Sequence, residues 1–228
     1  MAHFKNFLTK EEILKLSSCV TRTVTKDGKD FNEVISANFD RMDIFAGSIY
    51  YMLQGDRLMM LVVEYKPDGR AAFVKFPGGI SLPADNEKVT ETCIRESQEE
   101  CGFRPILENS ELIYWKYSSA DHLNCHHWKI FFLHHKKTGS LRSVSSSDHG
   151  ENSPAKWMPA EEVARKIHHT HWVACKRAIE SICKRLSGSS EPFADVACWY
   201  AYNEGVVVRE KQLAEYFAAK DQRKKKDG

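Results

Sequence analysis

The chain has 228 residues, of which 42% are hydrophobic, 28% charged and 11% aromatic. This balance is typical of a globular protein and excludes a disordered or fibrous chain. The 33 Lys and Arg against 31 Asp and Glu leave a formal charge of +2, so no global field indicates a nucleic-acid or membrane partner. Composition alone therefore excludes several classes of protein but indicates no activity.

The cysteines and the N-terminus indicate the compartment. Seven cysteines are spread along the chain, and none forms a Cys-x-x-Cys pair. The odd count favours reduced thiols in a cytosol over a disulfide framework or a structural zinc site. The N-terminus lacks the apolar stretch of a signal peptide, and a membrane-spanning helix would need about 20 apolar residues. We therefore expect a cytoplasmic protein without a membrane partner.

The first half of the chain reads as strands followed by one helix. Thr9 and Glu12 form a capping box, which predicts a short helix over residues 10–18. Strands are expected over residues 48–53, 58–65 and 71–76, with turns between them. Pro77 favours an extended residue before it, so the third strand should run into Gly78 and Gly79. A helix should follow over residues 87–101 and end at Gly102.

The second half reads as two strands followed by helices. The strands are expected over residues 111–117 and 127–135, before a Ser- and Gly-rich loop over 137–154. Residues 157–159 should open a helical region, with helices over 160–167 and 172–186. A linker over 187–192 precedes two more helices, 193–202 and 208–219, and a basic tail, 223–226. This order predicts an α/β fold with a mixed sheet covered by helices.

The helix over residues 87–101 carries an unusual set of charges. On a helical wheel its buried face comprises Val89, Thr90, Cys93, Ile94, Ser97 and Cys101. Glu96, Glu99 and Glu100 lie together along one edge of that face, where they should repel one another and weaken the helix. A hard cation, Mg²⁺ or Mn²⁺, would relieve this repulsion and bridge a diphosphate. The alternative is a solvated acidic surface.

Two neighbours of these glutamates favour the cation site. Arg95 lies four residues after Glu91 and four before Glu99, so it can orient the carboxylates. Gly78 and Gly79 would let the end of the strand approach a metal or a phosphate closely.

The whole segment resembles the box of the Nudix hydrolase family, written G-x5-E-x7-R-E-U-x-E-E-x-G-U with U a bulky apolar residue. Here seven residues separate Gly79 from Glu87, seven more separate Glu87 from Arg95, and the sequence from Arg95 to Phe103 reads RESQEECGF. There are two departures: the loop between Gly79 and Glu87 is two residues longer, and Ser97 replaces the first apolar residue.

This resemblance implies a fold and an activity. The fold is an α/β/α sandwich with a mixed sheet over residues 44–186, between an N-terminal extension, 1–43, and a C-terminal helical extension, 187–228. The activity is hydrolysis of the diphosphate linkage of a nucleoside diphosphate derivative, dependent on Mg²⁺ or Mn²⁺.

The resemblance also assigns roles to residues of the box. Glu96, Glu99 and Glu100 match metal-binding and base positions, and Gly78 matches a residue whose carbonyl reaches the metal. Arg95 and Glu87 match residues that orient the carboxylates.

Further candidates lie outside the box. Glu151, six residues before Trp157, resembles a loop glutamate that serves other members as a metal ligand or base; the alternative is an ordinary loop acid. Substrate contacts are expected from a lysine before the glycines and from aromatic residues that can stack a base, with core packing as the alternative for the aromatics. These candidates are Lys75, Trp115, Tyr117 and Trp128.

Two other functions stay open. One is a Nudix-like nucleotide-binding or regulatory domain without hydrolysis, against which the intact glutamate set counts. The other is an RNA-end hydrolase that uses the basic tail and the His-rich strand, against which the near-neutral charge counts. The C-terminal helices would cover the sheet, close over the substrate or form a homodimer contact.

Overall fold

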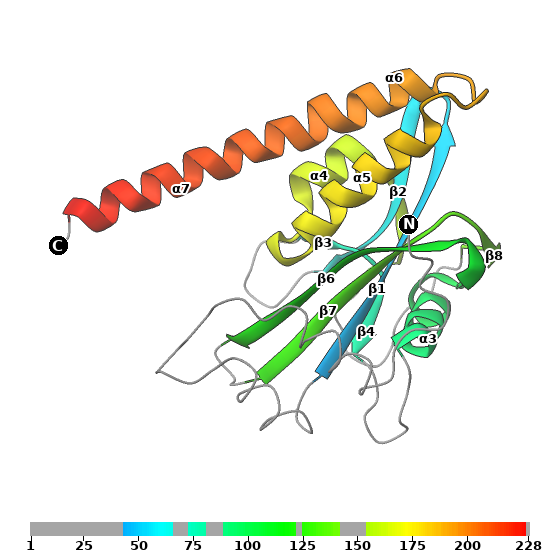
Figure 1. Cartoon of the computed structure of the whole chain (residues 1–228), viewed down its shortest axis with the longest axis horizontal. Coiled ribbons are helices and arrows are strands. Elements are labelled where there is room, and N and C mark those ends of the chain that lie inside the picture. Colours follow the sequence, from blue (N-terminus) through cyan, green and yellow to red (C-terminus); the bar gives the residue numbers. More distant parts are fainter. Residues whose placement is uncertain (1–42, 66–72, 81–88, 122–124, 142–153, 227–228) are drawn as a thin grey trace. The chain divides into compact units, whose positions relative to one another are not determined.

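The computed structural model describes residues 43–65, 73–80, 89–121, 125–141 and 154–226. The chain divides into two compact units, which we describe separately (Figure 1). The first unit comprises Met1–Ser48 and Pro77–Val144, and the second comprises Ile49–Phe76 and Ser145–Gly228. The helix expected over residues 10–18 lies outside the described residues.

Strand β1 (Asp43–Gln54) contributes its first half to the first unit and its second half to the second. Every residue from 46 to 50 is buried. Because neighbouring residues of a strand point to opposite faces, this unbroken run means that both faces of β1 are covered. At Gly47 a Cβ atom would lie 2.5 Å from the Phe131 ring, so the small residue is required for this packing.

The first unit contains the strands around the N-terminal half of β1. Strand β4 (Gly78–Ile80) pairs antiparallel with β1, and Gly78 lies opposite Gly47. Strands β6 (Ser110–Asp121) and β7 (Cys125–His134) form an antiparallel pair, and β7 also pairs with β1. A separate two-stranded sheet joins β5 (Phe103–Pro105) to β8 (Lys137–Gly139).

Helix α3 (Val89–Cys101) is the helix predicted from the glutamate-rich segment, and it packs on β4 and β5. It ends at Gly102 as predicted: this residue has a φ of +74°, and its N–H donates to the Gln98 carbonyl at 3.1 Å. A short 3₁₀ turn, η3 (Leu107–Asn109), leads into β6. The C-terminal end of α3 is thus fixed directly before β5, one of the strands that the helix contacts.

The second unit contains a smaller set of strands. The second half of β1 forms an antiparallel hairpin with β2 (Arg57–Tyr65), turning at Gly55 and Asp56. Strands β3 (Phe73–Lys75) and β9 (Lys156–Pro159) both pair antiparallel with β2. The apolar side chains of β2 supply much of this core: Leu58, Met60, Leu61, Val62 and Val63.

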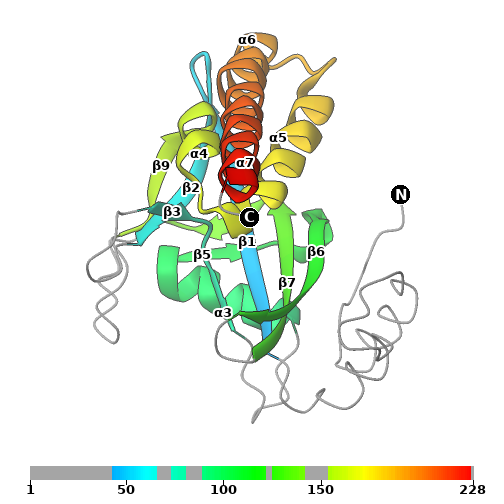
Figure 2. The same ribbon diagram turned by 90° about the vertical axis from the view of Figure 1, so that its left-hand side faces the viewer.

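Helices follow these strands along the chain. They are α4 (Ala160–Lys166), the 3₁₀ turn η4 (His169–His171), α5 (Trp172–Leu186), α6 (Ala194–Trp199), the π-helix η5 (Tyr200–Val207) and α7 (Val208–Lys226). Figures 1 and 2 both show α6, η5 and α7 as one continuous run beside α4 and α5. None of the helices within the described ranges is long and apolar enough to cross a membrane.

Close contacts anchor the C-terminal run within the second unit. Gly205 of η5 packs on α4, where an added Cβ would lie 2.8 Å from the Glu161 Cα. The Arg57 guanidinium lies 3.5 Å from the centre of the Tyr200 ring and 3.5 Å from a Glu161 carboxylate oxygen. The run also contacts β2 and α5. Its contacts with β2 fit the first of the three roles expected for the C-terminal helices, covering the sheet.

Three sequence-based expectations differ from the structure. Residues 156–159 form strand β9 because they pair with the edge of β2, whereas we expected 157–159 to open a helix. Residues 137–139 form strand β8 because they pair with β5, whereas we expected a loop. The two C-terminal helices are joined by η5, so no break separates them. Each difference arises from contacts between residues far apart in the sequence.

Candidate functional site

The site predicted from the sequence lies where β4 meets α3, entirely within the first unit. Gly78 donates its backbone N–H to Oε2 of Glu100 at 2.6 Å. Gly78 has a φ of +150°, and a side chain there would run into the Ala46 carbonyl oxygen and lie 2.7 Å from the Gly47 Cα. Only glycine suits this position, and the hydrogen bond from its N–H fixes the Glu100 carboxylate.

The next glycine receives the second carboxylate. A Cβ atom added to Gly79 would lie within 3.0 Å of both carboxylate oxygens of Glu96. The Glu96 carboxylate therefore occupies the space that any other residue at position 79 would fill. Its side chain is only 14% exposed, so solvent screens its charge less than that of a surface glutamate.

Arg95 connects the two elements. Its guanidinium donates to Glu96 Oε1 at 2.6 Å, to Glu99 Oε2 at 3.0 Å and to the Ile80 carbonyl at 3.1 Å. One side chain thus orients two carboxylates and holds the end of β4. Glu99 is the most open of these acids, with 57% of its side chain exposed. The orienting role expected for Arg95 is compatible with these contacts.

The buried face of α3 differs slightly from the helical-wheel prediction. Its buried residues are Val89, Thr92, Cys93, Ser97 and Cys101. Thr92 is buried although the prediction omitted it, and the predicted Thr90 and Ile94 are only half-buried. The buried face is therefore rotated toward the glutamate edge. Burial raises the pKa of both the Cys93 and the Cys101 thiol to about 12, so both stay protonated.

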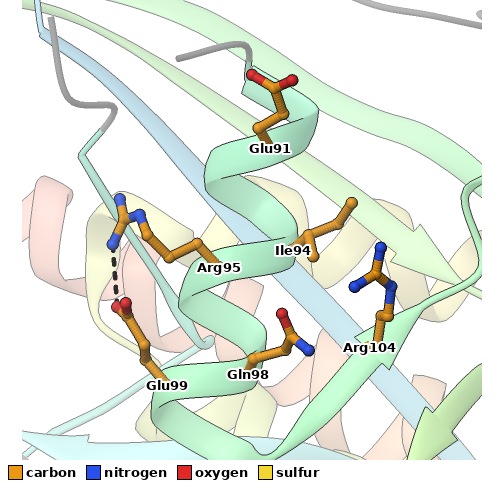
Figure 3. Close-up of a pocket in the computed structure, with 6 residues that line it drawn as sticks. All are labelled: Glu91, Ile94, Arg95, Gln98, Glu99 and Arg104. Carbon is orange, nitrogen blue, oxygen red and sulfur yellow. Dashed lines mark hydrogen bonds and ion pairs between the residues drawn. The ribbon is translucent and has the colours of Figure 1, made fainter. Parts of the chain in front are cut away.

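A hollow of about 390 Å³ lies beside the carboxylates. Its lining residues are Glu91, Ile94, Arg95, Gln98, Glu99 and Arg104. Figure 3 shows Arg104 of β5 facing Ile94 and Gln98 on one side of α3, with Arg95 and Glu99 on the other side. Glu96 and Glu100 do not line this hollow, so it adjoins the cluster and does not contain it.

The donor set suits a hard cation held by few protein ligands. Within the described part of the chain, no three His, Cys, Asp or Glu side chains converge closely enough to form a metal site by themselves. Mg²⁺ usually keeps several waters and binds one or two carboxylates together with substrate phosphates. The oxygens of Glu96 and Glu100, side by side on α3 and fitted against two glycines, match that requirement.

The other predicted residues are placed only in part. Glu87 and Glu151 lie outside the described residues, as do the side chains of Tyr117 and Trp128. Lys75 is half-buried on β3 of the second unit, and Trp115 is half-buried on β6 of the first. Among the described residues of the box, the structure brings together Gly78, Gly79, Arg95, Glu96, Glu99 and Glu100. The expected substrate contacts stay predictions.

The sequence reasoning missed Ser48, His134 and Arg104. Ser48 and His134 are buried in the first unit and lie 45 and 41 residues from their partner Cys93. Arg104 faces the hollow from β5. No local pattern in the sequence reports such contacts, because each depends on how strands far apart in the chain are paired.

A glycine pair at a strand end that receives a glutamate-rich helix, in an α/β fold with a mixed sheet, defines the Nudix class. Residues 46–177 match the NUDIX domain, which is more than half of the chain. The chain belongs to the NUDIX domain family. Comparison with the sequences of curated proteins finds no match.

A solved structure shows the same fold. The NUDIX domain of Shewanella oneidensis NrtR, determined with ADP ribose, aligns with a TM-score of 0.50 at 15% identity, covering 60% of this chain and 86% of that domain. A MutT NUDIX hydrolase from Burkholderia pseudomallei aligns at 0.47 and 20% identity, covering 60% and 97%. The predicted Nudix-like α/β fold with C-terminal helices is confirmed.

Proposed function

We propose that this protein is a cytoplasmic, Mg²⁺-dependent hydrolase that cleaves the diphosphate linkage of a nucleoside diphosphate derivative. One observation carries the proposal: the Glu96 and Glu100 carboxylates lie against Gly79 and Gly78 at the end of β4. Glu96 and Glu100 are four residues, or about one helical turn, apart, and like charges at this spacing destabilise a helix unless a cation lies between them. Membership of the NUDIX family supports the same reaction class.

The proposed metal ligands are oxygen atoms of the box and of one loop residue. They belong to Gly78, Glu96, Glu99, Glu100 and Glu151. Bound to such oxygens, Mg²⁺ or Mn²⁺ would supply positive charge for the diphosphate and lower the pKa of the attacking water.

The chain's own groups perform the remaining tasks. Arg95 orients Glu96 and Glu99 through hydrogen bonds of 2.6 and 3.0 Å, which hold one oxygen of each carboxylate at the same guanidinium nitrogen. Glu96 or Glu151 accepts the proton of the attacking water. Glu87 is proposed to orient the carboxylates from the start of the box. Attack at one phosphorus then releases a phosphate-bearing product.

The substrate assignment extends this proposal. Lys75 would meet phosphate, and Trp115, Tyr117 and Trp128 would stack the base. ADP ribose is the first compound to test, because the NrtR domain with the same fold was determined with it. Residues 44–186 would form the catalytic core, and the extensions 1–43 and 187–228 would be additions, with a homodimer contact as one role for the C-terminal helices.

A product screen tests the proposal. The protein is incubated with ADP ribose, nucleoside triphosphates, dinucleoside polyphosphates and capped RNA, with Mg²⁺ or with a chelator, in water enriched in ¹⁸O. We expect one compound class to give a phosphate product that carries ¹⁸O, and only with Mg²⁺. Tight binding of a nucleotide without any product across the panel would contradict hydrolysis and favour the binding-domain alternative.

The same screen separates the RNA-end alternative. Turnover of capped RNA alone, with an affinity that falls steeply with salt and is lost on deleting residues 222–228, would replace the small-nucleotide substrate. With the near-neutral charge of the chain, we expect neither result.

A further inference from the structure

Polar side chains lie buried beneath α3, where the Nudix pattern would place an apolar contact. Ser97 stands at the first apolar position of the pattern and has no exposed surface. Ser48 of β1 is equally buried, and His134 of β7 is 2% exposed. A buried hydroxyl or imidazole is costly unless it is hydrogen-bonded, so each of these groups requires a partner.

Hydrogen bonds connect Ser97 of α3 to Ser48 of β1, and Ser48 to a second residue of α3. Ser97 donates its hydroxyl hydrogen to Oγ of Ser48 at 2.7 Å. Oγ of Ser48 lies 2.9 Å from Sγ of Cys93, which is one helical turn before Ser97 on α3. Two positions of α3 are thus bonded to a single hydroxyl of the strand.

The contacts then continue to the far strand. Sγ of Cys93 lies 3.4 Å from Nε2 of His134. Nδ1 of His134 lies 2.7 Å from Oγ of Ser110, which donates to the Ile106 carbonyl at 3.0 Å. We call Ser97, Ser48, Cys93, His134 and Ser110 the polar chain.

The hydrogen positions in the polar chain follow from its far end. Ser110 has one hydroxyl hydrogen, which it gives to the Ile106 carbonyl, so it accepts from His134 Nδ1–H. Burial lowers the pKa of His134 to about 3, so the ring is neutral and its Nε2 accepts a hydrogen from the Cys93 thiol. The Cys93 sulfur then accepts from Ser48, and Ser48 accepts from Ser97. Every hydrogen in the polar chain points the same way.

Ser48 also holds the other side of the candidate site. Its backbone N–H donates to the Pro77 carbonyl at 2.8 Å, directly before Gly78. Its side chain meanwhile holds Ser97, which directly follows Glu96. Ser48 therefore joins the glycine strand to the helix that carries the carboxylates.

We propose that Ser48 and the polar chain are positioning groups, which set the rotation of α3 so that Glu96 and Glu100 face Gly79 and Gly78. This inference rests on the proposed function, since it treats the two glutamates as metal ligands. Hydrogen bonds of fixed length and direction specify one rotation of a helix, whereas an apolar contact at position 97 would tolerate a small rotation. The polar residue that departs from the family pattern thus has a geometric role.

The test measures metal affinity, which requires no substrate. Binding of Mn²⁺ to the full chain is titrated by electron paramagnetic resonance for wild type, Ser48→Ala and Ser97→Ala, with thermal unfolding recorded for each. We expect both variants to raise the Kd for Mn²⁺ by about ten- to a hundredfold, as for other groups that orient metal ligands. Ser97→Ala removes only the terminal donor, so it decides the matter if Ser48→Ala does not fold.

Leu133→Val is the matched control. Leu133 is fully buried on β7 beside His134 but points to the opposite face of the strand. The Leu133→Val substitution should lower the midpoint of thermal unfolding and leave the Kd for Mn²⁺ unchanged. Wild-type affinity in both serine variants, or an equal loss in Leu133→Val, would overturn the positioning role alone. Failure of the wild-type protein to bind Mn²⁺ would overturn the proposed function together with this role.

Discussion

Gly78 and Gly79 each lie against a carboxylate, but different atoms exclude a side chain at the two positions. At Gly78 the obstacle to a side chain is backbone, since the Ala46 carbonyl and the Gly47 Cα lie in its way. At Gly79 the obstacle is the end of a flexible side chain, the Glu96 carboxylate. The same substitution should therefore affect stability at one position and chemistry at the other.

We expect Gly79→Ala to reduce turnover with little loss of stability. The new methyl group displaces the Glu96 carboxylate, which can rotate away, so the free energy of unfolding should change by less than about 1 kcal/mol. The rate of Mg²⁺-dependent hydrolysis should fall by at least about tenfold. Rate assays and urea unfolding of the same preparation measure both quantities.

Gly78→Ala is the comparison for that variant. Its methyl group meets rigid backbone at a φ of +150°, so the free energy of unfolding should fall by about 1–3 kcal/mol. Equal stability losses in the two variants would show that the Glu96 carboxylate does not occupy the space at Gly79.

The sequence was sufficient to predict the residues of the box but not their partners. Arg95 and Glu99 are four residues apart on one helix, and local helical geometry alone makes them neighbours. The hydrogen bond from Arg95 to the Ile80 carbonyl, by contrast, depends on where the pairing of β4 with β1 places Ile80. Arg104 and the hollow that it lines were not predicted, for the same reason.

At the scale of elements, helices with strong periodicity were predicted best. The bounds of α5 agree with the prediction, because its apolar residues recur at helical spacing and burial follows them. The short strands β8 and β9 were missed, because each exists only through pairing with another strand. The π-helix η5 was missed as well, since Gly205 gives no sign in the sequence of its packing on α4.

The packing of η5 gives a stability prediction. In an exposed helix, Gly→Ala usually stabilises by up to about 1 kcal/mol. At Gly205 the methyl group would lie 2.8 Å from the Glu161 Cα, and such overpacking costs about 1–3 kcal/mol, so we expect a net loss. Urea unfolding measures the change in the free energy of unfolding. Gln212 is exposed on α7, and Gln212→Ala is the control that should keep its stability. A more stable Gly205→Ala variant would contradict the close packing.

The buried His134 makes the stability of the fold depend on pH. Its pKa is lowered by burial from 6.5 to about 3, so between these values the unfolded chain binds a proton that the folded chain does not. The stability contribution is complete above pH 6.5 and declines as the pH falls toward 3, by at most about 1.4 kcal/mol per pH unit. We expect His134→Gln to flatten this part of the unfolding profile. If the free energy of unfolding fell equally with pH in wild type and His134→Gln, His134 would bind its proton in the folded protein as readily as in the unfolded chain.

At the scale of the whole molecule, the near-neutral charge concealed the site. Lys and Arg nearly balance Asp and Glu over 228 residues, whereas the glutamates of the site gather on one helix. Composition averages over the chain, so only the spacing of the glutamates could reveal the cluster. The assignment to the NUDIX family agrees with what that spacing indicated.

The most direct test of the account compares Glu100→Gln with wild type in Mg²⁺-dependent hydrolysis of the best substrate from the screen. Glutamine can still accept the hydrogen bond from Gly78 N–H, so the fold should persist while the ligand charge is lost. The exposed Glu108→Gln on η3 removes the same charge elsewhere in the first unit and serves as the control. The account predicts at least about a hundredfold loss of rate in Glu100→Gln alone; full Mg²⁺-dependent activity in that variant would contradict it.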